Sequence, residues 1–329
     1  DLLNIDNETL EDAKEMEAVY DDVRADPLYK KLLAMANVHT ADAFGLDVPS
    51  DADERMARAL HSDAWEKIEQ IEAQDWFRTA QAMAEDERFF HWELEFPMAF
   101  YDQDGERHED AGFDAVIGNP PYINANEMNK SGFSEQKEYW KDKYETSHGA
   151  YDIYILFFER STELLSNGKR LGLITPNKFL SAPYAEHLRK FIAENHSLSK
   201  ICDVSQVGVF SDVSVYPIIT FIDSGEKTQN IEIVDGNGQG YTAVGTYQSD
   251  VLYRLPDLIW GFLLSEGLSI VEKIGNETIT LGEYSEVVAS TTAAEADEYS
   301  PAIQEWDRHS DDLMKLVNTG IIDRYVSTW

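Results

Sequence analysis

Apolar residues recur at helical spacing through the first part of the chain, and charged residues fill most of the positions between them. This pattern predicts a helix that begins near Asn7, a second with Pro27 in its first turn, a third capped by Ser50 and a longer one over residues 64–84. Proline suits a first helical turn because the amide hydrogen that it lacks has no partner there. Residues 1–88 are therefore predicted to form a helical subdomain.

The pattern changes after residue 88, where short apolar runs alternate with amphipathic stretches. The amphipathic stretches predict helices over 153–165 and 184–195. The apolar runs predict strands over 113–118, 170–175, 199–204 and 215–222. Strands separated by helices are typical of an α/β fold with a mostly parallel sheet and helices on both faces. Residues 89–225 are therefore predicted to form one α/β unit.

The last part of the chain, residues 226–329, changes character again. Two β-prone runs, 231–234 and 241–244, flank a glycine-rich stretch. A phosphate-binding loop would need a helix directly after the glycines, and none is indicated, so the pattern favours a hairpin. Beyond it, residues 265–274 predict a helix and residues 278–288 a strand-rich segment.

One motif stands at the end of the first predicted strand. Asn119-Pro120-Pro121-Tyr122 follows directly on the run over 113–118. Two consecutive prolines exclude a helix and remove two backbone donors, so the chain must leave the strand in an extended turn. Open α/β sheets bind their ligands at the carboxyl ends of the strands. Asn119 and Tyr122 are therefore candidate site residues at that edge.

The residue types in this motif suit an aromatic amine. The exocyclic amino group of adenine is a poor nucleophile because its lone pair is delocalised into the ring. The side-chain oxygen of Asn119 and the carbonyl of Pro120 can both accept hydrogen bonds from it, and Tyr122 can stack on the base. Such a site works by positioning and electrostatics rather than by a strong base. The base must leave the DNA helix to reach it.

Several stretches resemble a known family. FDAVIGNPPYI over 113–123 resembles motif IV of adenine-specific DNA methyltransferases, and FFHWELEFP over 89–97 is similar to the lead-in of large type IIG restriction–modification methylases and their phage-defence relatives. Tyr151-Asp152-Ile153-Tyr154 resembles motif V, TPNKF over 175–179 resembles motif VI, and Val209-Phe210 with the following VYPIITFI resembles motif VIII. The resemblance implies a Rossmann-like methyltransferase fold that is incomplete in this chain.

This resemblance implies that a methyl group is transferred from S-adenosylmethionine to N6 of an extruded adenine in DNA, within a restriction–modification or phage-defence system. It assigns Asn119, Pro120 and Tyr122 to the amino group and the base, and Phe210 to the second face of the base. It also implies that residues 226–329 begin a target-recognition region. Two alternatives stay open: an N-methyltransferase of protein glutamine, which shares the NPPY motif, and a catalytically inert DNA-binding fragment.

The sequence departs from the family where the cofactor would bind. The family holds S-adenosylmethionine on a glycine-rich loop that follows a strand upstream of motif IV, whereas Gly45 and Gly105 stand alone in that part of the chain. The cofactor contacts are therefore left unassigned. Because the chain begins at Asp1 without a start signal, we expect that the cofactor half lies upstream and that this chain does not methylate by itself.

The net charge of the chain bears on whether it can bind a nucleic acid. The formal net charge is −35, with 27 Lys and Arg against 62 Asp and Glu. Such acidity resembles that of proteins from salt-loving organisms, and at molar salt the Debye length falls to about 3 Å, so repulsion from phosphates is largely screened. The candidate DNA contacts are lysines, most of them interleaved with aromatic residues after the NPPY motif: Lys130, Lys137, Lys141, Lys143 and Lys178. A solvated helix face with the aromatic residues packed inward is the other interpretation of that stretch.

Composition excludes several other classes. No apolar run approaches the roughly 18 residues of a membrane-spanning helix, so no membrane partner is expected. The single cysteine, Cys202, excludes a disulfide framework, and the 8 histidines show no metal spacing, so no metal site is predicted. A DNA-modifying enzyme is expected in the cytoplasm. The oligomeric state and the DNA target stay open.

Overall fold

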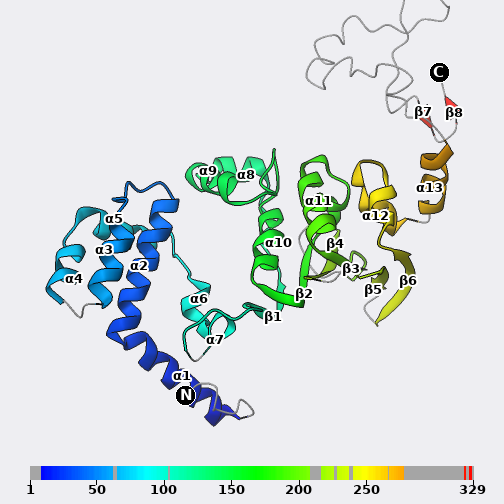
Figure 1. Cartoon of the computed structure of the whole chain (residues 1–329). Coiled ribbons are helices and arrows are strands. Elements are labelled where there is room, and N and C mark those ends of the chain that lie inside the picture. The colour runs from blue at the N-terminus through cyan, green and yellow to red at the C-terminus, as the bar shows by residue number, and fades with distance from the viewer. Residues whose placement is uncertain are drawn as a thin grey trace, which may run out of the picture. The chain divides into compact units, whose positions relative to one another are not determined.

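The computed structural model describes residues 9–61, 65–102, 104–207, 216–225, 228–236, 240–265 and 267–277, and two short strands further on. It divides into two compact units, Asp1–Asn276 and Glu277–Trp329. In the second unit, β7 (Ile322–Asp323) pairs antiparallel with β8 (Val326–Ser327). Figure 1 labels the α-helices and the strands. Within the described ranges, none of the helices combines the length and the apolar character needed to cross a membrane.

The described elements as far as residue 100 are helices, as the sequence predicted. Thr9 caps the first one, because its hydroxyl accepts from the amide of Asp12 while the Asp12 carboxylate accepts from the amide of Thr9. The predicted cap Asn7 lies outside the described residues. The predicted helix over 64–84 is divided in two. The bounds are α1 (Leu10–Ala25), α2 (Pro27–Ala43), α3 (Ala52–His61), α4 (Trp65–Glu72), α5 (Asp75–Asp86), α6 (Trp92–Glu95) and α7 (Pro97–Phe100).

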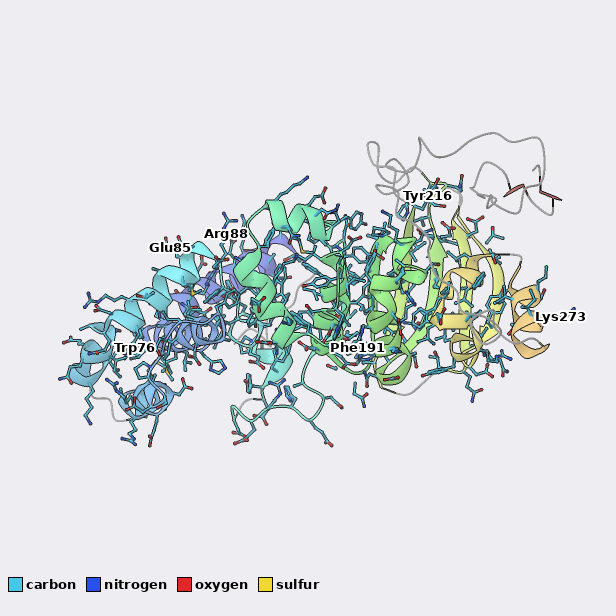
Figure 2. The ribbon with its side chains drawn as sticks, turned by 90° about the horizontal axis from the view of Figure 1, so that it is seen from above. Trp76, Glu85, Arg88, Phe191, Tyr216 and Lys273 are labelled. Carbon is cyan, nitrogen blue, oxygen red and sulfur yellow. The ribbon has the colours of Figure 1, made fainter. Side chains whose placement is uncertain are left out.

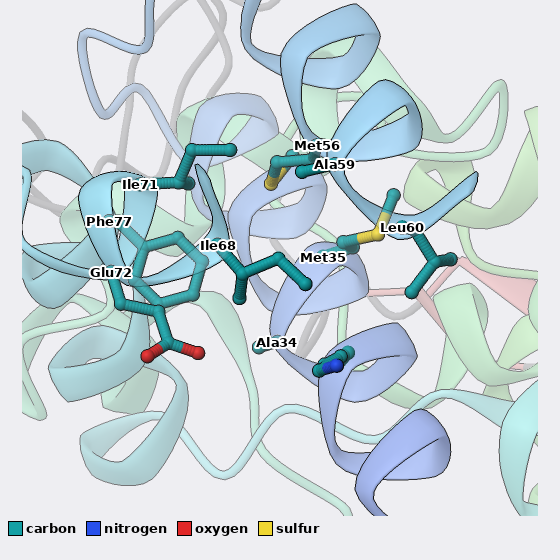
Figure 3. Close-up of a pocket in the computed structure, with 10 residues that line it drawn as sticks. Ala34, Met35, Met56, Ala59, Leu60, Ile68, Ile71, Glu72 and Phe77 are labelled. Carbon is teal, nitrogen blue, oxygen red and sulfur yellow. The ribbon is translucent and has the colours of Figure 1, made fainter. Parts of the chain in front are cut away.

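Helices α2 to α5 share a small apolar core of their own. Val38, Met56 and Phe77 are among its buried residues, each from a different helix. A pocket opens into this core and is lined from all four helices, with Lys31 and Glu72 as its charged members (Figure 3). The first helix, α1, contributes no buried residue. Helices α2 to α5 therefore form a helical layer with an apolar core of its own.

Six strands form one mixed sheet in the order β1-β2-β4-β3-β5-β6. β1 pairs parallel with β2, and β3 pairs parallel with β5. β4 runs antiparallel between β2 and β3, and β6 runs antiparallel to β5. The α/β class is confirmed, and most strands share one direction, but the neighbouring pairs are more often antiparallel than predicted. The bounds are β1 (Phe113–Gly118), β2 (Leu165–Pro176), β3 (Ser197–Asp203), β4 (Pro217–Asp223), β5 (Asn230–Gly236) and β6 (Tyr241–Gln248).

The last two strands of this sheet form the hairpin that the glycine-rich stretch predicted. Their register brings Gly236 opposite Tyr241 and Asn230 opposite Gln248. β5 also pairs with β3, so the hairpin continues the sheet that begins at β1. The glycine-rich stretch therefore joins two antiparallel strands rather than a strand and a following helix.

Two helices lie beside the strands in Figure 1, α10 (Tyr154–Glu163) and α11 (Glu186–Asn195). Their buried residues join the largest apolar cluster together with Leu171 and Leu173 of β2. On the other face, Cys202 and Val234 form a small cluster with residues that also lie on strands or directly after them. The prediction of helices on both faces is therefore not met within the described residues. The remaining helices are α8 (Ala125–Lys130), α9 (Ser134–Lys143), α12 (Val251–Arg254) and α13 (Leu268–Glu277), with 3₁₀ helices η2 (Asn177–Leu180), η3 (Pro183–Ala185), η4 (Pro256–Leu258) and η5 (Trp260–Leu264).

Candidate functional site

The NPPY turn leaves the carboxyl end of β1, as the sequence predicted. It is anchored at both ends, because Gly118 pairs with Leu173 of β2 and the carbonyl of Ile123 accepts from the amide of Ile153 at 2.9 Å. Between these anchors Pro120 is buried and Asn119 is exposed. A rigid, buried proline therefore presents the asparagine side chain to solvent, where an incoming molecule can reach it.

Tyr122 is held in one orientation by two partners. Its hydroxyl donates to the carbonyl of Ile174 on β2 at 3.1 Å. Its ring meets the ring of Tyr154 edge-on, with 6.2 Å between the centroids and 80° between the planes. Burial raises the pKa of the Tyr122 hydroxyl, so that it remains a neutral donor at physiological pH. The orientation of the Tyr122 ring is thus fixed.

The ring of Tyr154, which contacts Tyr122, is itself held by a short chain of hydrogen bonds. The hydroxyls of Tyr154 and Tyr184 lie 2.9 Å apart, and Tyr184 donates to the carboxylate of Asp152 at 3.0 Å. Burial raises the pKa of the Asp152 carboxyl, while the hydrogen bond from Tyr184 and the charge of Lys178 act in the opposite direction. Asp152 and Tyr154 come from the segment that resembles motif V, Lys178 comes from the segment that resembles motif VI, and Tyr184 follows on η3. The structure thus brings the segments together around one turn.

Two further residues lie at the same edge of the sheet. Lys178 follows β2 on η2 and is exposed, as expected for a residue at the rim of a site. Tyr216 directly precedes β4, is 64% exposed, and its carbonyl accepts from the amide of Asn177 at 2.9 Å (Figure 2). The sequence analysis did not single out Tyr216. The sequence offered one signal for it, an aromatic residue directly before Pro217 at the start of a strand. Phe210, the predicted second stacking ring, lies outside the described residues.

The lysines after the NPPY turn are distributed over α8 and α9. Lys130, Lys141 and Lys143 are exposed, whereas Lys137 is half-buried and donates to Asn129 at 2.6 Å. The aromatic residues between them face inward. Tyr139 stacks on Phe44 of the helical layer, with 4.4 Å between the centroids, and Trp140 contacts Phe133, with 5.9 Å between the centroids. Lysines are therefore presented to solvent there, while these aromatic rings serve packing.

The segment after α9 is fixed by one buried carboxylate. Glu159 of α10 accepts from the amides of Glu145 and Thr146, both at 2.9 Å, and from the Thr146 hydroxyl at 2.7 Å. The Glu159 side chain is buried. A buried carboxylate is stable only when its oxygens are satisfied in this way. Glu159 thus holds the connection between the lysine-bearing helix and the segment that resembles motif V.

We expect Glu159→Ala to lower the free energy of unfolding by about 2–4 kcal/mol, because two backbone amides and a hydroxyl lose a charged acceptor. Urea denaturation measures this change. Glu163→Ala on the same helix is the control, since its carboxylate pairs with a partly exposed Arg160 and should matter by less than about 1 kcal/mol. Equal losses in the two variants would contradict the role given to Glu159.

The described residues do not provide the whole of a cofactor site. Before β1 they form helices α1 to α7, without a strand followed by a glycine-rich turn. S-adenosylmethionine therefore does not fit a loop in that part of the chain. Within the described residues, no three His, Cys, Asp or Glu side chains are arranged to hold a metal ion.

An α/β sheet that presents an NPPY turn at its carboxyl edge defines a class of methyltransferase-like proteins, and sequence comparison specifies the family. Residues 30–210, more than half of the chain, match the Eco57I restriction-modification methylase family. The chain belongs to this family. The restriction–modification methylase identity that the motifs predicted is thereby confirmed.

Individual relatives match over a shorter stretch. The chain is 34% identical to the type II restriction enzyme and methyltransferase RM.Eco57I of Escherichia coli over 111 residues, which cover 34% of this chain and 11% of that protein. It is 37% identical to the type II methyltransferase M.PaeR7I of Pseudomonas aeruginosa over 111 residues, which cover 33% of this chain and 19% of that protein. The chain thus spans only a small part of the length of these relatives.

Solved structures show a more distant likeness. The type IIG restriction endonuclease BpuSI is 16% identical, with a TM-score of 0.37, and the match covers 58% of this chain and 28% of BpuSI. The DNA complex of DrdV is 13% identical, with a TM-score of 0.35, and the match covers 47% of this chain and 19% of DrdV.

Proposed function

We propose that this chain is part of a DNA adenine-N6 methyltransferase that acts in a restriction–modification or phage-defence system. It is the part that binds the amino group of the target adenine. The observation that carries the proposal is the NPPY turn, in which a buried proline and a fixed tyrosine hold an exposed Asn119 at the carboxyl edge of the sheet. S-adenosylmethionine would supply the methyl group as a sulfonium donor. In this proposal the substrate is DNA, and the enzyme acts in the cytoplasm.

Each site residue has a task in this proposal. The side-chain oxygen of Asn119 and the carbonyl of Pro120 accept hydrogen bonds from the amino group of an extruded adenine, which frees its lone pair from the ring. Tyr122 stacks on the base, and Phe210 takes the opposite face. Lys130, Lys137, Lys141, Lys143 and Lys178 contact DNA phosphates. Residues 1–88 form a helical subdomain in front of the methylase part, residues 89–225. Residues 226–329 begin the target-recognition region, and their first two strands, β5 and β6, extend the sheet of the methylase part.

Two other functions use the same turn. A glutamine amide of a protein also carries an NH₂ group that two acceptors could bind, so a protein-glutamine N-methyltransferase is the second enzyme candidate. A DNA-binding part without catalysis is the third candidate. The wide exposure of Asn119 and the exposed lysines after the turn favour a large, charged substrate over a small one.

Adenine recognition is tested with DNA in which little free energy is needed to move the target base out of the helix. Degenerate duplexes carry one central base opposite an abasic position, and that base is adenine, N6,N6-dimethyladenine or cytosine. Binding is measured by mobility shift from about 0.1 M to about 1 M salt, because the Debye length falls from about 10 Å to about 3 Å across that range. We expect adenine to bind about 5- to 30-fold more tightly than N6,N6-dimethyladenine, which has no N–H to donate, since two hydrogen bonds contribute about 1 kcal/mol each.

The Asn119→Ala variant tests whether the Asn119 side chain recognises the amino group of adenine. We expect its preference for adenine to fall about fivefold, because one of the two acceptors is lost while the carbonyl of Pro120 remains. The total DNA affinity should change little, because phosphate contacts supply most of it. Asn126→Ala is the control, an exposed asparagine on α8. DNA binding without an adenine preference would favour the inert fragment, and no DNA binding at any salt would favour the protein-glutamine enzyme.

A further inference from the structure

A buried arginine lies behind the segment that carries Lys178. Arg189 of α11 is only 2% exposed. One nitrogen of its guanidinium donates to the carbonyls of Phe179 and Ala182, both at 2.8 Å, and another donates to the carbonyl of Asp257 at 3.4 Å. A buried cation is costly unless polar groups satisfy it. Here the dipoles of backbone carbonyls do so, and the rigid, planar guanidinium in turn fixes where these carbonyls lie.

Two of the three carbonyls belong to residues 177–182, which we call the rim segment. Lys178 is exposed in it. The amides of Ser181 and Ala182 both donate to the carbonyl of Lys178, at 3.1 and 2.8 Å, and close a tight turn. Arg189 holds this turn from the inside of the protein, while the lysine side chain lies outside. A shift of the backbone at Lys178 would therefore disturb the contacts with Arg189.

The third carbonyl belongs to a strained turn that follows the β5–β6 hairpin. Asp257 and Leu258 have φ values of +50° and +53°, a region that leucine rarely adopts. Such residues persist only where the surrounding structure holds them in place. The next turn, η5, packs directly on the rim segment, because a Cβ on Gly261 would overlap the hydroxyl of Ser181. Arg189 thus joins the rim segment to a second segment from much later in the chain.

We propose that Arg189 is a positioning residue, which holds the rim segment so that Lys178 contacts a DNA phosphate. The inference rests on the proposed function, because it needs DNA as the substrate. A lysine side chain loses rotamer freedom when it binds, so its contact gains most when the backbone that carries it is already fixed. Lys178 follows β2, where the carbonyl of Ile174 accepts from Tyr122. The phosphate would therefore lie at the sheet edge that holds the NPPY turn.

The test measures how DNA binding depends on salt, because that dependence counts phosphate contacts. The probe is the duplex with adenine opposite an abasic position, from about 0.1 M to about 1 M salt. One lysine–phosphate contact contributes about 0.9 to the slope of the logarithm of the association constant against the logarithm of salt concentration. We expect Lys178→Ala to lose this contribution, which makes binding about eightfold weaker at 0.1 M salt and leaves it unchanged at 1 M.

Arg189→Met is expected to lose at least half of the same contribution, although the lysine is still present. The double variant should bind like Lys178→Ala alone, because two residues that act through one contact are not additive. Arg189→Gln keeps one donor for the carbonyls and replaces Arg189→Met in every measurement if the methionine variant does not fold. Far-UV circular dichroism decides this.

Ile192→Ala is the matched control, because Ile192 is fully buried one turn further along α11. It should lower stability while leaving the salt dependence unchanged. Amide hydrogen exchange adds a measurement without DNA. We expect the amides of Ser181 and Ala182 to exchange at least tenfold faster in Arg189→Met than in Ile192→Ala, since only the first variant frees the rim segment.

The outcomes separate positioning from core packing. An unchanged slope in Lys178→Ala or in Arg189→Met would overturn the proposal, and so would equal effects of Arg189→Met and Ile192→Ala. A double variant with a larger loss than Lys178→Ala would also overturn it, because Arg189 would then act independently of the lysine. If the chain bound no DNA at any salt, the proposed function would fail together with this inference. DNA binding with an unaltered slope would refute the inference alone.

Discussion

Replacing Gly112 with alanine is expected to lower the free energy of unfolding by about 3 kcal/mol or more. Gly112 stands directly before β1 with a φ of +142°, and its amide donates to the carbonyl of Ala99 at 2.8 Å. A Cβ there would lie 2.5 Å from the amide nitrogen of Ser166 and 2.8 Å from the carbonyl oxygen of Leu164. Backbone atoms cannot move aside as a flexible side chain can, so overpacking adds about 1–3 kcal/mol to the conformational strain.

The consequence reaches the site because Gly112 sets how closely β1 approaches β2. The clash would push the beginning of β1 away from residues 164–166, and the NPPY turn at its other end would lose its register. Urea denaturation measures the loss of stability. Gly45→Ala is the matched control, since Gly45 also has a positive φ, +94°, but a Cβ there would meet nothing within 4 Å. We expect about 1 kcal/mol for the control, and equal losses in the two variants would contradict the packing argument.

The sequence carried enough information to place the strand and the turn that form the site. β1 spans 113–118, as predicted, because an apolar run between Gly112 and Pro120 leaves little freedom for its ends. Asn119 and Tyr122 could be chosen because two prolines restrict the backbone whatever surrounds it. Local signals of this kind do not depend on the rest of the fold.

Other features depended on contacts between distant residues. The direction of β4 was not predicted, because the alternation of side chains along a strand is the same in parallel and antiparallel pairing. The support of Tyr122 by Ile174 and Tyr154 joins segments more than 30 residues apart, and no local pattern indicates it. The inward packing of Tyr139 needed the position of Phe44 in another helix. The sequence left that stretch with two interpretations for this reason.

The open face of the sheet was also missed, for a related reason. Alternating strands and helices indicate that helices pack on a sheet. They do not indicate which face of the sheet each helix covers. In the structure α10 and α11 contribute to one cluster, and Ile117 on the opposite face stays exposed. The apolar composition of β1 is typical of a central strand, whereas β1 lies at an edge of the sheet that the described residues form.

Replacing Tyr154 with alanine is expected to cost about 3–5 kcal/mol of stability and to release Tyr122. The Tyr154 side chain is fully buried in the largest apolar cluster, and its removal leaves a cavity directly against the Tyr122 ring. Phe157→Ala on the same helix is the control, because Phe157 is 40% exposed and its loss should cost less than about 1 kcal/mol. Urea denaturation compares the two variants.

Tyr154→Phe separates the ring from its hydroxyl. Phenylalanine keeps the edge-on contact with Tyr122, while Tyr184 can still donate to Asp152, so we expect a loss of only about 1 kcal/mol. Fluorine NMR of protein labelled with 3-fluorotyrosine reports the surroundings of Tyr122 directly. We expect its resonance to move little in Tyr154→Phe and to shift or broaden in Tyr154→Ala. If both variants left the resonance unchanged, contacts other than the one with Tyr154 would hold the ring, and Tyr154 would serve the core rather than the site.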